Sequence, residues 1–288
     1  AGTIITVSQP ANPAFIPIQI ALDADGFATI NLFNWKSTIT TATSNVVLNT
    51  GLLIKSNNPV SSYYAITQAD SEIYTLKGRN GLGNDFLVSS QSVMGAKDSG
   101  TSSVEIVAVE NNTVVTIKPS QACVGRAKGV EFSITLDKGQ TYALKAAAST
   151  AGSQLRNTII HSDKPIAVNS TDDMVLNGSG ADLIGEQILP TSFAGNKYIA
   201  VANSSGVEKL FLFALTNNTL VRVNGVTETT LNAGDEYVYT INPSTATLIT
   251  SDNDKPFIVF QVTGTGASNV ELGGTVLPDI SCTGSKEI

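Results

Sequence analysis

Short apolar runs separated by turn residues dominate the hydrophobic pattern of this chain. Residues 104–109, 210–215 and 257–262 are rich in β-branched and aromatic side chains, and turn-forming residues bound each run. Long segments with the 3.6-residue period of an amphipathic helix are hard to find. The pattern therefore predicts an all-β protein.

The same order of strands and turns recurs along the chain. The strand predicted at residues 104–109 is followed by Asn-Asn at 111–112 and a second strand, and the strand predicted at 209–215 is followed by Asn-Asn at 217–218 and a second strand. Because asparagine tolerates the left-handed conformation that tight hairpins require, each pair predicts a hairpin turn.

The correspondence continues downstream of both hairpins. Each copy has a turn with a glycine free to adopt positive φ, Gly139 in one and Gly234 in the other, followed by an aromatic residue that opens a strand. Residues 159–168 and 248–259 then match as a strand, a polar turn, and a proline that starts another strand. This internal repeat predicts the fold more strongly than any single motif.

A shorter third copy is predicted at the N-terminal end. Residues 22–27 supply its glycine turn and residues 53–60 its proline turn, whereas its opening strands are missing. Residues 272–278 resemble residues 184–190, the segment that we take to open the third copy. We therefore expect residues 272–278 to supply a missing opening strand of the first copy.

Each complete copy holds about seven short strands, the number typical of a β-sandwich. We predict three pseudo-repeated sandwich-like modules at residues 1–66 (incomplete), 67–172 and 173–262, with residues 263–288 as a closing segment or the start of a further module. Pairing of that segment with the first module would close three modules around a pseudo-threefold axis. Otherwise the modules form a rod.

The composition favours extracellular β structure and excludes two classes of partner. Charged residues make up 14% of the chain against ~25% in an average domain, and the net charge is −7. Lysine and arginine never cluster, so we expect neither a nucleic-acid partner nor an anionic membrane partner. No apolar stretch is long enough to span a bilayer.

Five segments together resemble the IgGFc-binding protein N-terminal domain family. They are residues 83–86, 111–113, 162–168, 185–190 and 277–285, and their order extends over most of the chain. The resemblance implies an extracellular recognition or adhesion module without catalytic activity, and it does not imply immunoglobulin binding by this chain. The cysteine-poor composition is similar to the bacterial, Bacteroidetes-type branch of surface proteins.

Candidate catalytic residues are few. His161 is the sole histidine, and the repeat places Lys55 and Thr250 at equivalent positions, which favours a solvated strand residue over a general base. Glu186 could be one of a pair of glycosidase carboxylates, but its repeat counterpart is Gly274 and no second acid is indicated. We expect it to cap a loop, and we predict no catalytic residue and no cofactor.

Two short acidic segments are candidates for calcium binding. Asp23, Asp25 and Gly26 begin like a calcium loop, and Asp252 and Asp254 have a similar spacing. Neither segment continues with the remaining ligands of such a loop, and Asx turns explain both equally well. We predict no metal site.

Trp35 is the one candidate ligand-binding residue. It is the only tryptophan and lies in a polar stretch that could expose its ring to a sugar or a protein partner, although packing over the incomplete first module explains it as well. Sequons for N-glycosylation, relevant only in a eukaryotic host, occur at Asn111, Asn169, Asn177, Asn203 and Asn217.

The two cysteines have no metal-binding spacing. Cys123 and Cys282 would form a disulfide if the C-terminal segment returns to the second module; otherwise both remain thiols. The extracellular compartment implied by the family resemblance favours the disulfide.

Two functional hypotheses remain open. The first is a non-enzymatic surface or secreted module that binds a host glycoprotein or glycan, because repeated scaffolds with divergent loops offer recognition surfaces. The alternative is a structural component of an extracellular assembly, such as a phage appendage or a surface filament, that contacts copies of itself.

Overall fold

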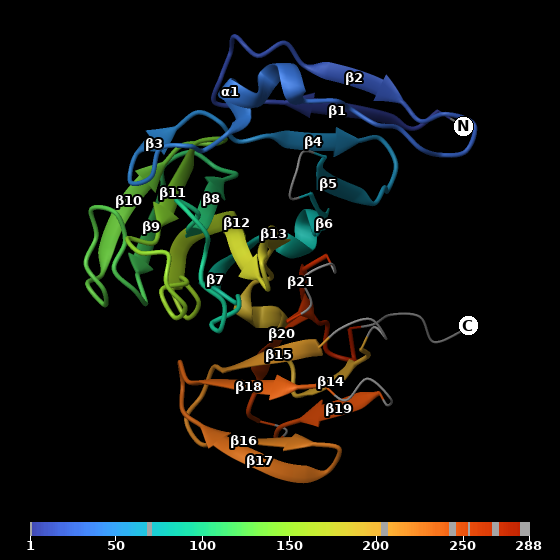
Figure 1. The fold of residues 1–288 in the computed structure, drawn as a ribbon. Helices are drawn as coiled ribbons and strands as arrows, with labels where there is room; N and C mark the ends of the chain where they lie inside the picture. Colours follow the sequence, from blue (N-terminus) through green and yellow to red (C-terminus); the bar gives the residue numbers. More distant parts are fainter. Residues whose placement is uncertain are drawn as a thin grey trace.

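In a computed structural model, β-strands are the main secondary structure of the described residues, and loops and turns connect them (Figure 1). The structure describes residues 2–67, 71–202, 207–241, 246–252, 254–266 and 271–282. Across these ranges no helix has the length and apolar character needed to cross a bilayer. The prediction of an all-β fold is confirmed.

Seven strands form the second unit, a sandwich of two sheets. One sheet has the order β7-β12-β9-β10 and the other β13-β12-β8-β11. The strands are β7 (Gly83–Leu87), β8 (Ser102–Ala108), β9 (Thr113–Lys118), β10 (Phe132–Leu136), β11 (Thr141–Lys145), β12 (Ile159–Asn177) and β13 (Gly180–Gln187).

The long strand β12 belongs to both sheets. Residues 159–162 pair with β9, residues 166–168 pair with β8, and the segment from Asn169 onward pairs with β13. The pairing with β7 shifts register between His161 and Ile166. The strand can change sheets there because Pro165 cannot donate a ladder hydrogen bond.

The third unit has the same arrangement, with eight strands because the counterpart of β12 is divided into β19 and β20. Its sheets have the orders β14-β19-β16-β17 and β21-β20-β15-β18. The strands are β14 (Lys197–Ala200), β15 (Val207–Ala214), β16 (Thr219–Val223), β17 (Val226–Leu231), β18 (Glu236–Thr240), β19 (Thr247–Thr250), β20 (Phe257–Thr265) and β21 (Gly273–Val276); the 3-10 turn η3 (Thr191–Phe193) leads into this unit.

Corresponding turns of the two sandwiches share their backbone geometry. Asn112 and Asn218 have φ of 54° and 58°, as expected for hairpin turns, and Gly139 and Gly234 have φ of 81° and 84°. The amide of Gly139 donates to the carbonyl of Ala108 at 2.8 Å, and that of Gly234 donates to the carbonyl of Ala214 at 3.0 Å. The sequence match between these segments is therefore accompanied by the same hydrogen bonds.

The first unit is smaller. Its sheets are β2-β1-β4 and β5-β6, while β3 joins the second unit by pairing with β11. The elements are β1 (Ile4–Ser8), β2 (Ile18–Ala21), η1 (Phe33–Trp35), α1 (Lys36–Ile39), β3 (Val47–Leu48), β4 (Leu53–Ser56), β5 (Ser62–Ile66), β6 (Glu72–Leu76) and η2 (Gly78–Gly81).

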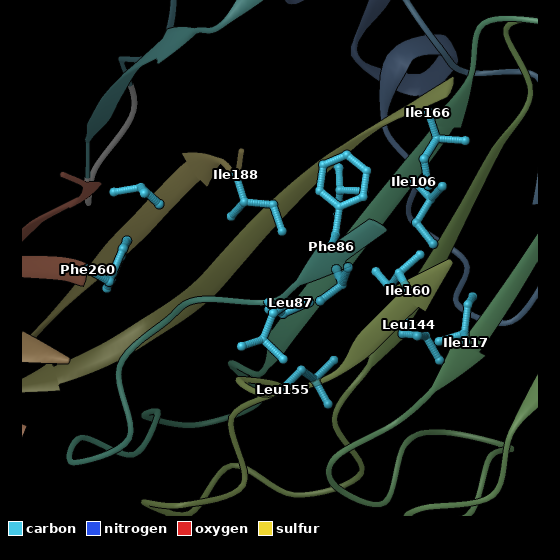
Figure 2. Close-up of a cluster of buried hydrophobic side chains, with 14 of the residues drawn as sticks. Phe86, Leu87, Ile106, Ile117, Leu144, Leu155, Ile160, Ile166, Ile188 and Phe260 are labelled. Carbon is cyan, nitrogen blue, oxygen red and sulfur yellow. The ribbon is translucent and has the colours of Figure 1, made fainter. Parts of the chain in front are cut away.

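Two clusters of buried apolar side chains form the cores of the second and third units. One fills the second sandwich and reaches the facing sheet of the third unit, and the other lies inside the third sandwich. Figure 2 shows the first cluster, in which Phe86, Ile106 and Ile160 come from three different strands. Among the described residues before Phe86, the buried hydrophobic side chains are Val7, Phe15 and Tyr74. The first unit therefore has little core of its own.

The C-terminal segment does not pair as the sequence suggested. β21 pairs with β20 in the third unit, from Phe260 opposite Val276 to Thr263 opposite Gly273. It is the counterpart of β13, which closes the second unit, so the likeness of residues 272–278 to 184–190 marks closing strands and not opening strands. The module boundaries expected at 172/173 and 262/263 accordingly fall inside β12 and β20.

Candidate functional site

A groove of about 310 Å³ lies where the second and third units meet. The second unit contributes Val93 and Met94, which follow β7, and the end of β12 with Leu176. The third unit contributes the start of β15 with Val207 and Lys209, together with the end of β20. Two sandwiches thus supply opposite walls of one groove.

A buried asparagine fastens these two walls together. The side chain of Asn177, at the end of β12, donates from Nδ2 to the carbonyl of Gly264 and accepts at Oδ1 from the amide of Gly266, both at 3.0 Å. Thr265 donates from Oγ1 to the carbonyl of Val207 at 2.7 Å, which ties β20 to β15. The base of the groove is therefore held by hydrogen bonds across the junction.

The groove presents apolar surface beside one positive charge. Val93, Leu176 and Val207 are 41%, 41% and 47% exposed, respectively. Lys209 is the only charged side chain among its described lining residues, which include no acid, histidine or cysteine. Such a surface can bind an apolar group and a nearby anion, but it lacks the groups needed for acid–base or nucleophilic catalysis.

Three carboxylates link the closing strands of the three units. Glu72 on β6 accepts from the amide of Gly185 on β13 at 3.0 Å, and Asp182 on β13 accepts from the amide of Leu272 before β21 at 2.7 Å. Glu271 is 3.2 Å from the hydroxyl of Ser71, which precedes β6, and accepts a hydrogen bond from it. We call these contacts the carboxylate ring; β6, β13 and β21 meet in the middle of the molecule (Figure 1).

Burial changes the acidity of Glu72. Loss of solvation raises its pKa to about 7, hydrogen bonds from Gly185 and Ile73 act against this rise, and the charges of Asp182 and Glu271 add to it. Each carboxylate of the ring accepts a hydrogen bond from protein, so the ring joins the units. In the part of the chain that is described, no group of His, Cys, Asp and Glu side chains is placed to hold a metal ion.

Glu186 lies beside this ring and forms an ion pair. Its Oε1 is 2.5 Å from Nζ of Lys77, and the carboxylate is almost completely buried. Burial raises the pKa of Glu186 to about 7, and the charge of Lys77 opposes that rise. The neighbouring Gln187 accepts at Oε1 from the backbone amide of Lys77 at 2.5 Å. Both side chains hold the turn that follows β6.

His161 is part of an exposed row across one sheet. Its Nδ1 is 2.6 Å from Oδ1 of Asp85, and the two side chains are 60% and 64% exposed. Thr116 lies opposite His161 on the other side, and its hydroxyl is 2.9 Å from that of Ser133. These four side chains lie on an open sheet surface, as expected for solvated strand residues.

The acidic segments considered for calcium form local contacts. Asp23 accepts at Oδ1 from the amides of Asp25 and Phe27 at 3.0 and 2.8 Å, which makes an Asx turn. Asp252 accepts from Nη1 of Arg222 at 2.9 Å. The Asx-turn interpretation accounts for the first segment, and an ion pair with Arg222 accounts for Asp252 in the second.

Trp35 is partly buried. Its ring packs at a tilt of 53° against the buried ring of Phe15, with the centroids 6.2 Å apart. It lies in the first unit, on a different part of the molecule from the groove. Of the sequons, Asn111 and Asn217 lie in the two hairpin turns, and Asn203 lies outside the described residues.

The two cysteines, whose pairing was predicted only if the C-terminal segment returns to the second module, are free thiols in this structure. Cys123 is buried in the second unit, where its amide donates to the carbonyl of Arg126, and burial raises its pKa to about 11. Cys282 is exposed and follows β21, with its amide donating to the carbonyl of Asp279 in the third unit. Because β21 belongs to the third unit, the C-terminal segment does not bring Cys282 to Cys123.

Sequence reasoning missed the groove, the ring and Asp279. Asp279 accepts hydrogen bonds from the amides of Asn196, Lys197 and Ser281 at 2.8–2.9 Å. Burial would raise the pKa of this carboxyl, but the hydrogen bonds from Ser281, Lys197 and Asn196 hold it below its usual range. The only sequence signal that pointed to Asp279 was its position in residues 277–285, one of the segments that resemble the family.

Comparison with known proteins identifies one family. No curated protein and no solved structure matches the chain. The family model described as IgGFc binding protein matches residues 71–283, which include the second and third units with the groove and most of the carboxylate ring. Because this match extends over most of its length, the chain belongs to the IgGFc binding protein family.

Proposed function

We propose that the chain is a non-enzymatic recognition module of a surface or secreted protein, and that its groove binds an apolar side chain of a protein partner. The observation that carries the proposal is the exposure of Val93, Leu176 and Val207 around one groove at the junction of two units. Membership of a family of binding domains supports it.

The lining specifies the chemistry of that partner. Aliphatic side chains around a concave surface favour an apolar anchor, since removing such surface from water stabilises a complex by about 25 cal/mol per Å². Lys209 lies beside this surface and favours a partner with a carboxylate close to its anchor. We propose a host glycoprotein that presents such a segment as the partner.

The test combines a binding screen with variants of the groove. The chain is screened against immobilised glycoproteins, immunoglobulin Fc and a glycan array, and its mass in solution is measured in parallel. For each partner found, we expect Leu176→Asp and Val207→Asp to weaken binding at least about tenfold, since a charge would be desolvated in an apolar contact. The control is Val226→Asp on β17, which replaces a side chain that is 63% exposed and outside the groove.

Each outcome is decisive. Binding of a protein that the groove variants weaken and the control leaves unchanged supports the proposal. Binding of free glycans alone, or binding that all three variants leave unchanged, overturns it. Self-association of the chain without any bound partner would favour the structural-assembly alternative.

A further inference from the structure

One wall of the groove, formed by Val93 and Met94, is held from behind by buried side chains. Oε1 of Gln91 accepts from the amides of Val93 and Met94 at 2.9 and 2.8 Å, and its Nε2 donates to the carbonyl of Met94 at 2.9 Å. Gln154 also donates from Nε2 to that carbonyl. Both glutamines are buried. The position of this wall therefore depends on hydrogen bonds with side chains that the groove does not expose.

A buried carboxyl lies behind the same turn. Oδ2 of Asp172, on β12, accepts from Nε2 of Gln91 at 3.2 Å, and Asp172 is 3% exposed. Its Oδ1 has no partner in hydrogen-bond geometry among the described residues. Asp172 and Gln91 both line a cavity of about 10 Å³, which has room for about one water molecule. Gln91 thus connects an incompletely paired carboxyl to the wall of the groove.

A bulge in β12 places this carboxyl next to the groove. The pairing of β12 with β13 shifts register between Asp172 and Val175, and Met174 has a φ of 53°, which is uncommon for a residue other than glycine. The amide of Leu176 then donates to the carbonyl of Gly95 at 2.9 Å. Bulges occur often beside binding sites, where they redirect a side chain. This one leads directly from the buried carboxyl to Leu176 of the groove.

The charged surroundings of Asp172 are simple. The positive charge of Arg156, just before β12, acts on the carboxyl, and Arg156 is itself paired with Glu236 on β18. Asp173 lines the cavity beside it, whereas the other described lining side chains, from the segments after β7 and before β12, carry no titratable group. On β13, Ile184 lies opposite Asp172. The carboxyl therefore faces one cation, one neighbouring acid and neutral groups.

These surroundings make the carboxyl sensitive to pH near neutrality. Burial raises the pKa of Asp172 to about 6, while the nearby hydroxyl of Ser102, the hydrogen bond from Gln91 and the charge of Arg156 act against this rise. A group that lowers a pKa interacts more strongly with the ionised form. Protonation of Asp172 therefore weakens its contact with Gln91.

We propose that Asp172, acting through Gln91, positions the groove wall of Val93 and Met94, and that proton uptake by this carboxyl loosens the wall. The inference rests on the proposed function of the groove. A hydrogen bond to an ionised carboxylate is roughly twice as strong as one between neutral groups. The protonated carboxyl holds Gln91 less firmly, so the groove recognises its partner better at neutral pH than at about pH 5.

The two methionines of the chain make the test direct, because Met94 lies in the wall and Met174 in the bulge. The 288-residue chain is labelled with carbon-13 at its methionine methyl groups, and Met94→Leu assigns the two NMR signals. We expect the Met94 signal to move as the pH falls from about 7.5 to about 5, with a midpoint of about 6. Asp172→Asn, which keeps the size of the side chain but removes the titrating group, should abolish this movement.

Three further variants separate Asp172 from other sources of the signal. Asp173→Asn, at the exposed acid that lines the same cavity, should leave the midpoint unchanged. His161→Gln removes the sole histidine and should also leave it unchanged. Gln91→Ala cuts the connection between the carboxyl and the wall, so the Met94 signal should no longer follow the pH.

Hydrogen exchange measures how firmly the turn is held. After correction for the intrinsic effect of pH, the amides of Val93 and Met94 should exchange at least about threefold faster at about pH 5 than at about pH 7.5, and Asp172→Asn should remove this difference. Circular dichroism confirms that each variant is folded at both pH values.

Several results would overturn the proposal. They are a Met94 signal that does not titrate, one that titrates equally in Asp172→Asn or Gln91→Ala, and a titration that His161→Gln abolishes. None of these measurements uses a binding partner. If the proposed function failed because the groove variants bound every partner as the parent does, the titration of Met94 would remain, so the two failures are distinguishable.

Discussion

Asp279 shows how a single side chain holds a chain segment in place. Its carboxylate accepts hydrogen bonds from the amides of Asn196, just before β14, and Lys197, the first residue of β14. The carboxylate also lies so close to Gly195 that a Cβ on that residue would be 2.0 Å from Oδ2. A glycine and an acid far apart in sequence are therefore matched in space. The segment after β21 is fixed to the third unit by this contact.

We expect Asp279→Ala to lower the free energy of unfolding by about 1–3 kcal/mol, because three amides lose their acceptor. The pKa of Asp279 is lowered in the folded state, so its contribution is present above the pKa of the unfolded chain and is lost as the pH falls through the folded value. Urea melts at pH 7 and at successively lower pH measure both effects. An equal change for the exposed Asp25→Ala, or a difference between Asp279→Ala and the parent that stays constant with pH, would contradict this account.

Because His161 and its partner Asp85 are exposed, we expect a substitution of His161 to change the stability of the protein much less. Both members of its pair with Asp85 are more than half exposed, and exposed ion pairs contribute little. We expect His161→Gln to change the free energy of unfolding by no more than about 0.5 kcal/mol and to leave partner binding unchanged. A loss above about 2 kcal/mol in denaturant melts would show that this row of side chains has a specialised role.

At the scale of elements, local signals in the sequence predicted turns well and strand partners less well. Asn112 and Asn218 adopt positive φ because the side-chain chemistry that favours it is local. The likeness of residues 272–278 to 184–190 was also informative, but it showed equivalence without saying which end of a unit these strands occupy. Partner choice depends on residues far away along the chain, and periodicity does not report it.

Close contact between β21 and β13 gives a prediction at this scale. A Cβ on Gly274 would lie 2.5 Å from Cγ2 of Ile184 and 2.6 Å from Cζ of Phe260. We expect Gly274→Ala to destabilise the protein by about 1–3 kcal/mol, because buried neighbours must move. Gly180→Ala on β13 is the control, since the nearest atom to its Cβ is 3.7 Å away, and it should change stability by no more than about 0.5 kcal/mol. Thermal melts compare the two; similar shifts would contradict the packing argument.

At the scale of the whole molecule, the carboxylate ring relates the three units to one another. The sequence could not predict it, because Glu72, Asp182 and Glu271 share no motif and each accepts from a residue of a different unit. The closed arrangement considered from the sequence required β-pairing of the C-terminal segment with the first unit. The structure instead brings that segment to Ser71 through a side-chain contact, while its strand pairs within the third unit.

The ring makes stability depend on pH. Because burial raises the pKa of Glu72 to about 7 in the folded state, the protonated form favours folding; this contribution is fully present below the unfolded pKa and is lost as the pH rises through about 7. We expect the melting temperature to fall between pH 5 and pH 8, and Glu72→Gln to reduce that fall. Glu228→Gln, at an exposed acid of the third unit, is the control and should keep the parental slope. An unchanged slope in Glu72→Gln would exclude this carboxyl as its source.

The long sequence separations within the carboxylate ring also bear on the order in which parts of the protein fold. Its hydrogen bonds join residues 113, 90 and 200 positions apart, and contacts that close such long loops form slowly. The strands of each sandwich are closer in sequence, so both sandwiches can assemble before the ring closes. During synthesis from the N-terminal end, the ring cannot close until Glu271 has been added to the chain. Of the three strands β6, β13 and β21, β6 is synthesised first, so it spends the longest time without its ring contacts.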